Sequence, residues 1–116
     1  MEKGGKNMFT IMCVCNCGVG TSAFSRAIVK NNIEKANYNL REFKVENTEI
    51  TGVRGLKTDV IITQKALLPK MPAVGTNGIR AVIGLTSLVK DNGELAEQLV
   101  PVLAKAEQDG VIHKLS

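Results

Sequence analysis

Short apolar runs recur along the chain and are separated by stretches with helical periodicity. The runs at residues 8–14, 59–63 and 79–84 are nearly continuous, which is typical of strands that are covered on both faces. At residues 43–46 apolar and charged side chains alternate, which indicates a strand at the edge of a sheet. The pattern therefore predicts four strands.

Two stretches repeat their apolar residues at helical spacing. The first begins at Thr21 or Ser22, either of which can cap a helix, and continues to about residue 36. The second follows Asp91 and Glu94, which have the spacing of a capping box, and its apolar residues run from 95 to 106. Pro101 is expected to kink this second helix, because it removes one hydrogen bond.

Strands that alternate with helices predict an α/β fold, specifically a small three-layer sandwich of flavodoxin or Rossmann type. Its four-stranded sheet should be parallel with helices on both faces, and right-handed crossovers allow the strand order 2-1-3-4. The 116 residues fit one domain at 8–110, with a flexible leader at 1–7 and a tail at 111–116.

Composition excludes several classes of function. The net charge of +4 is modest, and no basic run is interleaved with aromatic residues, so a nucleic-acid partner is not expected. No apolar run approaches 18 residues, and the polar start does not resemble a signal peptide, so direct membrane insertion is not expected. Three cysteines, an odd number, favour a reducing cytosol.

The candidate chemistry lies in the loop between the first strand and the first helix. Residues 15–22 read Cys-Asn-Cys-Gly-Val-Gly-Thr-Ser. A strand, a glycine-rich loop and a helix N-terminus together can hold phosphate with backbone N–H groups. A cysteine in such a place ionises easily, and its thiolate can attack phosphorus and carry the phosphoryl group. We interpret Cys15 as this nucleophile.

Related loops fit the sequence less well. A Walker loop would need a lysine before Thr21, and a dinucleotide fingerprint would need a third glycine. A cysteine phosphatase would need an arginine six residues after its cysteine, and none of the three cysteines has one.

The other two cysteines have simpler interpretations. Cys13 fits a buried strand residue, whereas Cys17 could fill the loop or pair with Cys15. The Cys-x-Cys-x-Cys spacing lacks the usual pattern of zinc ligands.

The loop resembles the phosphocysteine loop of the IIB subunits of the bacterial phosphoenolpyruvate-dependent sugar phosphotransferase system, in the branch that serves ascorbate, galactitol and mannitol. In that family the loop reads Cys-x-x-Gly-x-Gly-Ser/Thr-Ser after the first strand, and each defined position is met here. Residues 58–65 and 80–87 resemble the third and fourth strands of the family with the turns that follow them. The resemblance covers about residues 8–106.

The resemblance implies a phosphotransferase that is cytoplasmic and associated peripherally with the membrane. A phosphohistidine on a IIA protein would donate to Cys15, and the phosphoryl group would pass to a sugar bound by a membrane IIC permease. No cofactor and no metal would be needed. The residues that would bind the phosphoryl group are Asn16, Cys17, Gly18, Val19, Gly20, Thr21 and Ser22.

Three alternatives stay open from the sequence. A low-molecular-weight cysteine phosphatase is one, and a thiol redox or metal module that uses Cys13, Cys15 and Cys17 is another. The third is a regulatory domain of the same fold.

Residues 63–65 and 84–87 should leave the sheet at the same edge as the loop. Lys65 is therefore expected either to supply positive charge there or to be a solvated turn lysine.

Overall fold

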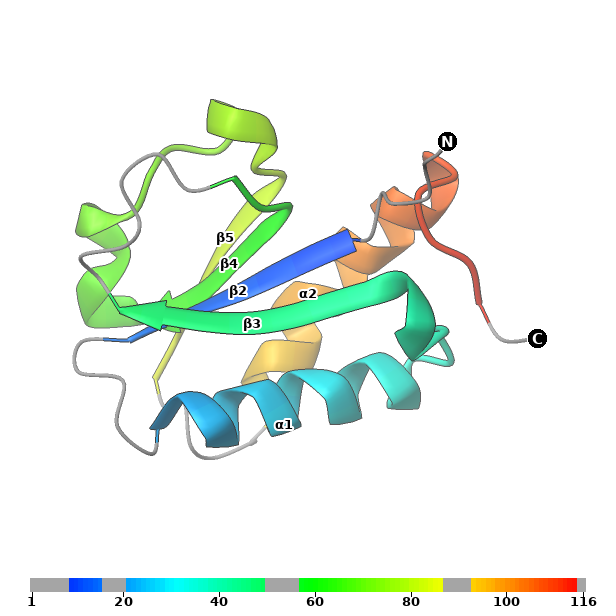
Figure 1. Cartoon of the computed structure of the whole chain (residues 1–116), viewed down its shortest axis with the longest axis horizontal. Coiled ribbons are helices and arrows are strands. Elements are labelled where there is room, and N and C mark those ends of the chain that lie inside the picture. Colours follow the sequence, from blue (N-terminus) through cyan, green and yellow to red (C-terminus); the bar gives the residue numbers. More distant parts are fainter. Residues whose placement is uncertain (1–8, 16–20, 50–56, 87–92, 115–116) are drawn as a thin grey trace.

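A computed structural model describes residues 9–15, 21–49, 57–86 and 93–114 of the chain (Figure 1). In this described part, helical segments follow the first, third and fourth strands, as the sequence predicts. In chain order the elements are β2 (Phe9–Cys15), α1 (Thr21–Lys35), the 3₁₀ helix η1 (Leu40–Glu42), β3 (Phe43–Glu49), β4 (Val60–Gln64), the 3₁₀ helices η3 (Lys65–Lys70) and η4 (Thr76–Gly78), β5 (Ala81–Leu85) and α2 (Glu94–Gln108).

The four strands form one parallel sheet in the order β3-β2-β4-β5. This is the predicted order 2-1-3-4. In the register, Phe9 pairs with Phe43 on one side of β2, and Ile11 pairs with Val60 on its other side. β2 is therefore a central strand, and its near-continuous apolar run reflects burial on both faces.

The main core lies between one face of the sheet and the two α-helices. Val29 and Ile33 of α1 and Leu99 and Leu103 of α2 are almost completely buried there. Alternate residues of β2 contribute to the same core, since successive strand residues point to opposite faces. The sheet residues in this cluster are Phe9, Ile11, Cys13, Phe43, Val45, Val60, Ile62, Ile83 and Leu85.

The opposite face is covered by the segment that connects β4 to β5, which contains η3 and η4. Met12, Val14, Ile61 and Ile79 form a second, smaller cluster on this face. Right-handed crossovers explain the two sides, because α1 leads from β2 to β3 while η3 and η4 lead from β4 to β5 in the opposite direction along the sheet. The predicted three-layer architecture is confirmed, and its third layer consists of 3₁₀ helices in the described part of the chain.

The helix ends follow local backbone chemistry. α1 ends at Lys35, two residues before Asn37, which takes the left-handed conformation with φ of 70°. Gly110, with φ of 80°, follows α2 in the same way. At each end the chain turns back through hydrogen bonds to the last helical turn, as in a Schellman motif.

The segment after α2 packs against the end of α1. Ile112 is fully buried, and Tyr38 forms an isolated antiparallel bridge with Lys114. The backbone N–H of His113 donates to Glu42 over 2.7 Å, and the His113 ring Nδ1 lies 2.9 Å from the same carboxylate. Partial burial acts to raise the pKa of the Glu42 carboxyl. The hydrogen bonds from His113 outweigh it, so the pKa of Glu42 lies below its ordinary value.

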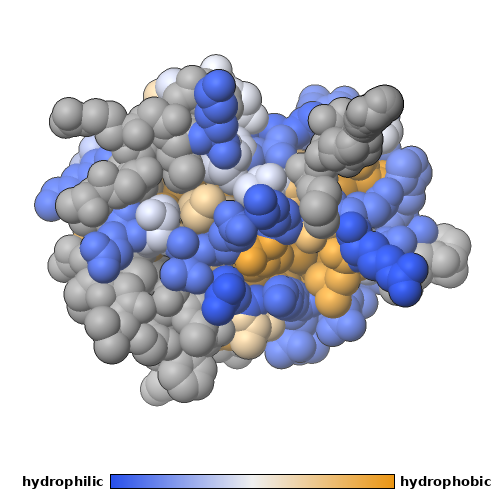
Figure 2. All heavy atoms as spheres, in the orientation of Figure 1, coloured by the Kyte–Doolittle hydropathy of each residue, from blue (hydrophilic) through white to orange (hydrophobic). Residues whose placement is uncertain are grey.

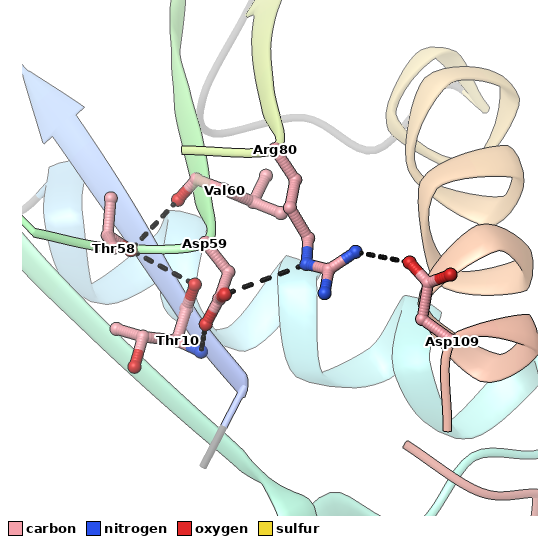
Figure 3. A network of polar contacts seen from close by, with 6 residues as sticks. All are labelled: Thr10, Thr58, Asp59, Val60, Arg80 and Asp109. Atoms are coloured by element: carbon pink, nitrogen blue, oxygen red, sulfur yellow. Dashed lines mark hydrogen bonds and ion pairs between the residues drawn. The ribbon is translucent and has the colours of Figure 1, made fainter. Parts of the chain in front are cut away.

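A polar network joins the amino ends of three strands to the end of α2 (Figure 3). Asp59 accepts a hydrogen bond from the backbone N–H of Thr10 over 2.8 Å, and the Thr58 hydroxyl donates to the Thr10 carbonyl over 3.0 Å. The Arg80 guanidinium lies between Asp59, at 3.7 Å, and Asp109, at 2.8 Å. This network fixes the edge of the sheet from which the strands start.

β3 is an outer strand of the sheet among the described residues and lies at the front in Figure 1. Its exposed side chains include Lys44 and Glu46, which form an ion pair at 3.7 Å. Charged side chains on an outer strand discourage pairing with another chain. Figure 2 shows the same view, in which hydrophilic residues cover much of the surface and apolar atoms show between them near the centre.

Candidate functional site

The carboxyl edge of the sheet carries the candidate site. Cys15 is the last residue of β2 and pairs in register with Glu49, the last residue of β3. On the other side of β2, Cys13 pairs with Ile62, so that Cys15 comes level with Gln64 at the end of β4. Gln64 in turn pairs with Leu85 at the end of β5. All four strands therefore end at one level.

Cys15 lies beside the point where the strand order reverses. The chain moves from β2 to β3 in one direction and from β4 to β5 in the other, so the reversal falls between β2 and β4. In open parallel α/β sheets, ligands bind beyond the carboxyl ends of the strands at such a point. The topology thus favours a ligand site between the segments that follow Cys15 and Gln64.

The hydroxyl of Thr63 ties the two central strands together at this edge. Thr63 is fully buried, and its Oγ1 donates to the carbonyl oxygen of Val14 over 2.7 Å. Val14 directly precedes Cys15, so this hydrogen bond fixes the backbone next to the candidate nucleophile. This role of Thr63 could not be predicted from the sequence, because a threonine within a β-branched run looks like an ordinary strand residue.

The candidate loop connects Cys15 to Thr21, the first residue of α1. This start of the helix agrees with the prediction. The first N–H groups of an α-helix have no partner within the helix, so they can bind an anion. The predicted phosphate-binding residues Asn16, Cys17, Gly18, Val19 and Gly20 lie outside the described residues, and their roles stay predictions. The roles of the Thr21 and Ser22 hydroxyls also stay predictions.

Cys13 is a core residue, as the sequence favoured. It lies in the middle of β2 with only 1% of its surface exposed, and it packs in the main core. Over the described residues, no three His, Cys, Asp or Glu side chains gather in a group that could hold a metal ion.

A charged cluster lies where β4 and β5 end. Glu94, in the first turn of α2, accepts hydrogen bonds from the backbone N–H of Thr86 over 2.7 Å and from the Thr86 hydroxyl over 3.1 Å. The ammonium group of Lys65 lies 3.1 Å from the same carboxylate. These contacts lower the pKa of Glu94 below its ordinary value. The hydrogen bond from the Thr86 N–H contributes most, followed by the contact with Lys65.

The capping-box prediction for α2 was wrong. Gly93, with φ of 90°, precedes the helix as its N-cap and makes no side-chain capping bond, and Asp91 lies outside the described residues. Glu94 instead holds the exit of β5 through Thr86. A spacing rule could not detect this contact, because Thr86 is paired with Glu94 through the tertiary fold.

Comparisons with known proteins leave the family open. No protein-family model matches the chain, and no curated protein matches it significantly. Within the described residues, no helix is both long enough and apolar enough to cross a membrane.

Proposed function

We propose that the protein is a phosphoryl carrier that accepts a phosphoryl group on Cys15, as a IIB subunit of a sugar phosphotransferase system. One observation supports this proposal above the others. Cys15 ends a central strand of a parallel sheet beside the reversal of strand order, and the chain leads from it to the N-terminus of α1. A thiolate at this place would meet a phosphoryl group where the fold favours anions.

The first transfer would take the phosphoryl group from a phosphohistidine of a IIA protein. The Cys15 thiolate attacks phosphorus, an S–P bond forms, and the P–N bond breaks with its electron pair going to the imidazole nitrogen. In the second transfer, a sugar hydroxyl in the IIC permease attacks phosphorus. An O–P bond forms and the S–P bond breaks, so that Cys15 leaves as a thiolate and the proton of the hydroxyl passes to water.

The chain would contribute orientation and electrostatic stabilisation to both transfers. Backbone N–H groups from Asn16 to Ser22 would hold the three phosphoryl oxygens, and preorganised dipoles of this kind stabilise the charge of the transition state. Gly18 and Gly20 would let the backbone approach the phosphoryl group without a Cβ in the way. The Thr63–Val14 hydrogen bond keeps the end of β2 in place beside β4.

The proposed subcellular location follows from the same transfers. A carrier that receives its phosphoryl group from IIA works in the cytoplasm, and delivery to a sugar in IIC requires contact with the membrane protein. The chain itself would then reach the membrane only through this partner.

The test is intact mass spectrometry after incubation with phosphoenolpyruvate, the general phosphotransfer proteins and a panel of IIA proteins. We expect wild-type protein to gain one phosphoryl group, which acid and iodine remove, and Cys15→Ser to gain none. Cys13→Ser is the matched control, because it removes a thiol of the same strand from the core. If wild-type protein gains nothing, or if Cys15→Ser gains as much, the carrier function is refuted.

A further inference from the structure

The ion pair between Lys65 and Glu94 lies at the candidate site, and Lys65 is held in it only weakly. The Lys65 side chain is 60% exposed, and ion pairs with such exposure hold their partners weakly. Glu94 does not depend on Lys65 for its position, because the N–H and hydroxyl of Thr86 both donate to its carboxylate. Lys65 can therefore leave Glu94 without disturbing the start of α2.

The backbone register places Lys65 close to Cys15. Cys15 comes level with Gln64 across the central pair of strands, and Lys65 is the next residue along the chain. Adjacent strands lie about 4.8 Å apart and advance about 3.3 Å per residue, so the two Cα atoms are separated by about 6 Å. The four-carbon side chain of lysine spans such a separation by rotation alone.

Resting on the proposed function, we infer that Lys65 exchanges partners: it pairs with Glu94 while Cys15 is free and with the phosphoryl group once Cys15 is phosphorylated. No bond forms or breaks in this exchange. A phosphoryl group carries up to two negative charges and outcompetes a single carboxylate for the ammonium group. Glu94 is a positioning residue, since it keeps the ammonium group at the carboxyl edge between transfers.

The charges around Cys15 explain why a phosphoryl group there would need a cation. Glu49 is exposed and pairs in register with Cys15 from β3, so its carboxylate opposes both a thiolate and a phosphoryl group there. The candidate loop has no arginine six residues after any cysteine, which is the cation that a cysteine phosphatase loop would supply. Lys65 supplies a mobile cation instead, one that can release the phosphoryl group to the next acceptor.

The first experiment measures the thiol pKa of Cys15 in the purified protein without any partner. Iodoacetamide alkylation is followed as a function of pH, and fragment ions in tandem mass spectrometry separate Cys15 from Cys13 and Cys17, which lie on the same tryptic peptide. We expect Glu94→Gln to lower the Cys15 pKa by about 0.5, because an ammonium group that is free to come within about 6 Å of the sulfur favours the thiolate by this amount in a water-like medium. The double variant Lys65→Gln/Glu94→Gln should return to the wild-type pKa.

Matched variants separate this effect from net charge. Lys70→Gln, at the other end of η3, and Glu97→Gln, in the same turn of α2 as Glu94, make the same charge changes away from the pair. Both should leave the Cys15 pKa unchanged. A Glu94→Gln variant that leaves it unchanged, or a double variant that does not restore it, overturns the inference.

The second experiment uses phosphoenolpyruvate, the general phosphotransfer proteins and IIA. We expect Lys65→Gln to hold about fivefold less phosphocysteine at equilibrium, which is at the upper end for an exposed ion pair, and Lys65→Arg to restore it. Equal phosphocysteine in wild type and Lys65→Gln overturns the exchange but leaves the carrier function standing. No phosphocysteine in wild type refutes the carrier function, whatever the alkylation experiment gives.

Discussion

Gly84 lies beneath the side chain of Leu68, and this close approach should make an alanine at position 84 destabilising. Gly84 is in β5, and Leu68 is in η3, which covers that face of the sheet. A Cβ on residue 84 would lie 2.5 Å from Cδ1 and 2.8 Å from Cγ of Leu68. Both distances are shorter than carbon atoms can approach, so Gly84→Ala must displace the leucine side chain.

The expected magnitude combines two opposing effects. Overpacking of a well-packed contact costs about 1–3 kcal/mol. Replacement of glycine by alanine within a strand returns roughly 0.5–1 kcal/mol, because the unfolded chain loses conformational freedom. The net loss in the free energy of unfolding should be about 1 kcal/mol. At an m-value of about 2 kcal/mol per M, the urea midpoint falls by roughly 0.5 M.

The assay is urea unfolding followed by circular dichroism, carried out as a double-mutant cycle. Leu68→Ala alone removes a side chain that is 37% exposed, and it should cost about 1 kcal/mol. The double variant should be no less stable than Leu68→Ala alone, since the small side chain leaves room for the new Cβ. This corresponds to a coupling free energy of about 1 kcal/mol or more.

Val74→Ala is the matched control, because Val74 belongs to the same connecting segment and is 60% exposed. It should show no coupling to Gly84→Ala. The packing argument is refuted if Gly84→Ala stabilises the protein, or if the losses from Gly84→Ala and Leu68→Ala simply add.

Three further predictions concern the rest of the fold. Tyr38 is the only tyrosine of the sequence, and its pKa is raised mainly by burial and then by Glu107, so the absorbance at 295 nm should titrate above pH 10. The free energy of unfolding that the neutral phenol contributes below pH 10 should be lost as the pH rises through the higher pKa of the folded state. Arg80→Gln should cost about 1 kcal/mol in urea unfolding, and a further Asp109→Asn should add little, whereas additive losses would contradict the network of Figure 3. Leu99→Ala should lower the free energy of unfolding by about 3–5 kcal/mol because it opens a cavity in the core, while a loss as large from the 40% exposed neighbour Val100→Ala would contradict the burial pattern.

The order of elements and the sheet could be predicted because they depend on local periodicity and on general rules of topology. The continuous apolar run of β2 indicated a strand buried on both faces, and the structure places it in the centre of the sheet. Bounds differ by one or two residues at β4 and β5, and by three at β3, which continues to Glu49. The polar residues Asn47 and Thr48 extend β3 because an outer strand needs burial on fewer sides.

The third layer was harder to predict, because its residues carry no periodic pattern. The segment between β4 and β5 contains three-residue and six-residue 3₁₀ helices, and Pro69 lies inside one of them. Helices this short gain their stability from contacts with the sheet rather than from propensity. Only the tertiary fold shows that Leu68 covers Gly84.

The candidate site was predicted in part. The position of Cys15 at the end of a strand could be read from the apolar run that precedes it. The partners of Lys65 could not, because Glu94 follows it by nearly thirty residues and reaches it only through the packing of α2. Thr63 was missed for a similar reason: its hydroxyl finds the Val14 carbonyl only after β2 and β4 have paired.

The central position of β2 has a consequence for synthesis of the chain. Its two neighbours, β3 and β4, both follow it in the sequence, and pairing with β4 begins only when Ile11 meets Val60. Because parallel neighbours are never joined by a tight turn, β2 emerges from the ribosome long before either neighbour is available. Half of the chain must therefore be translated before the strand that ends in Cys15 can be enclosed. Nascent chains arrested before residue 60 would keep this strand open to chaperones and to thiol reagents.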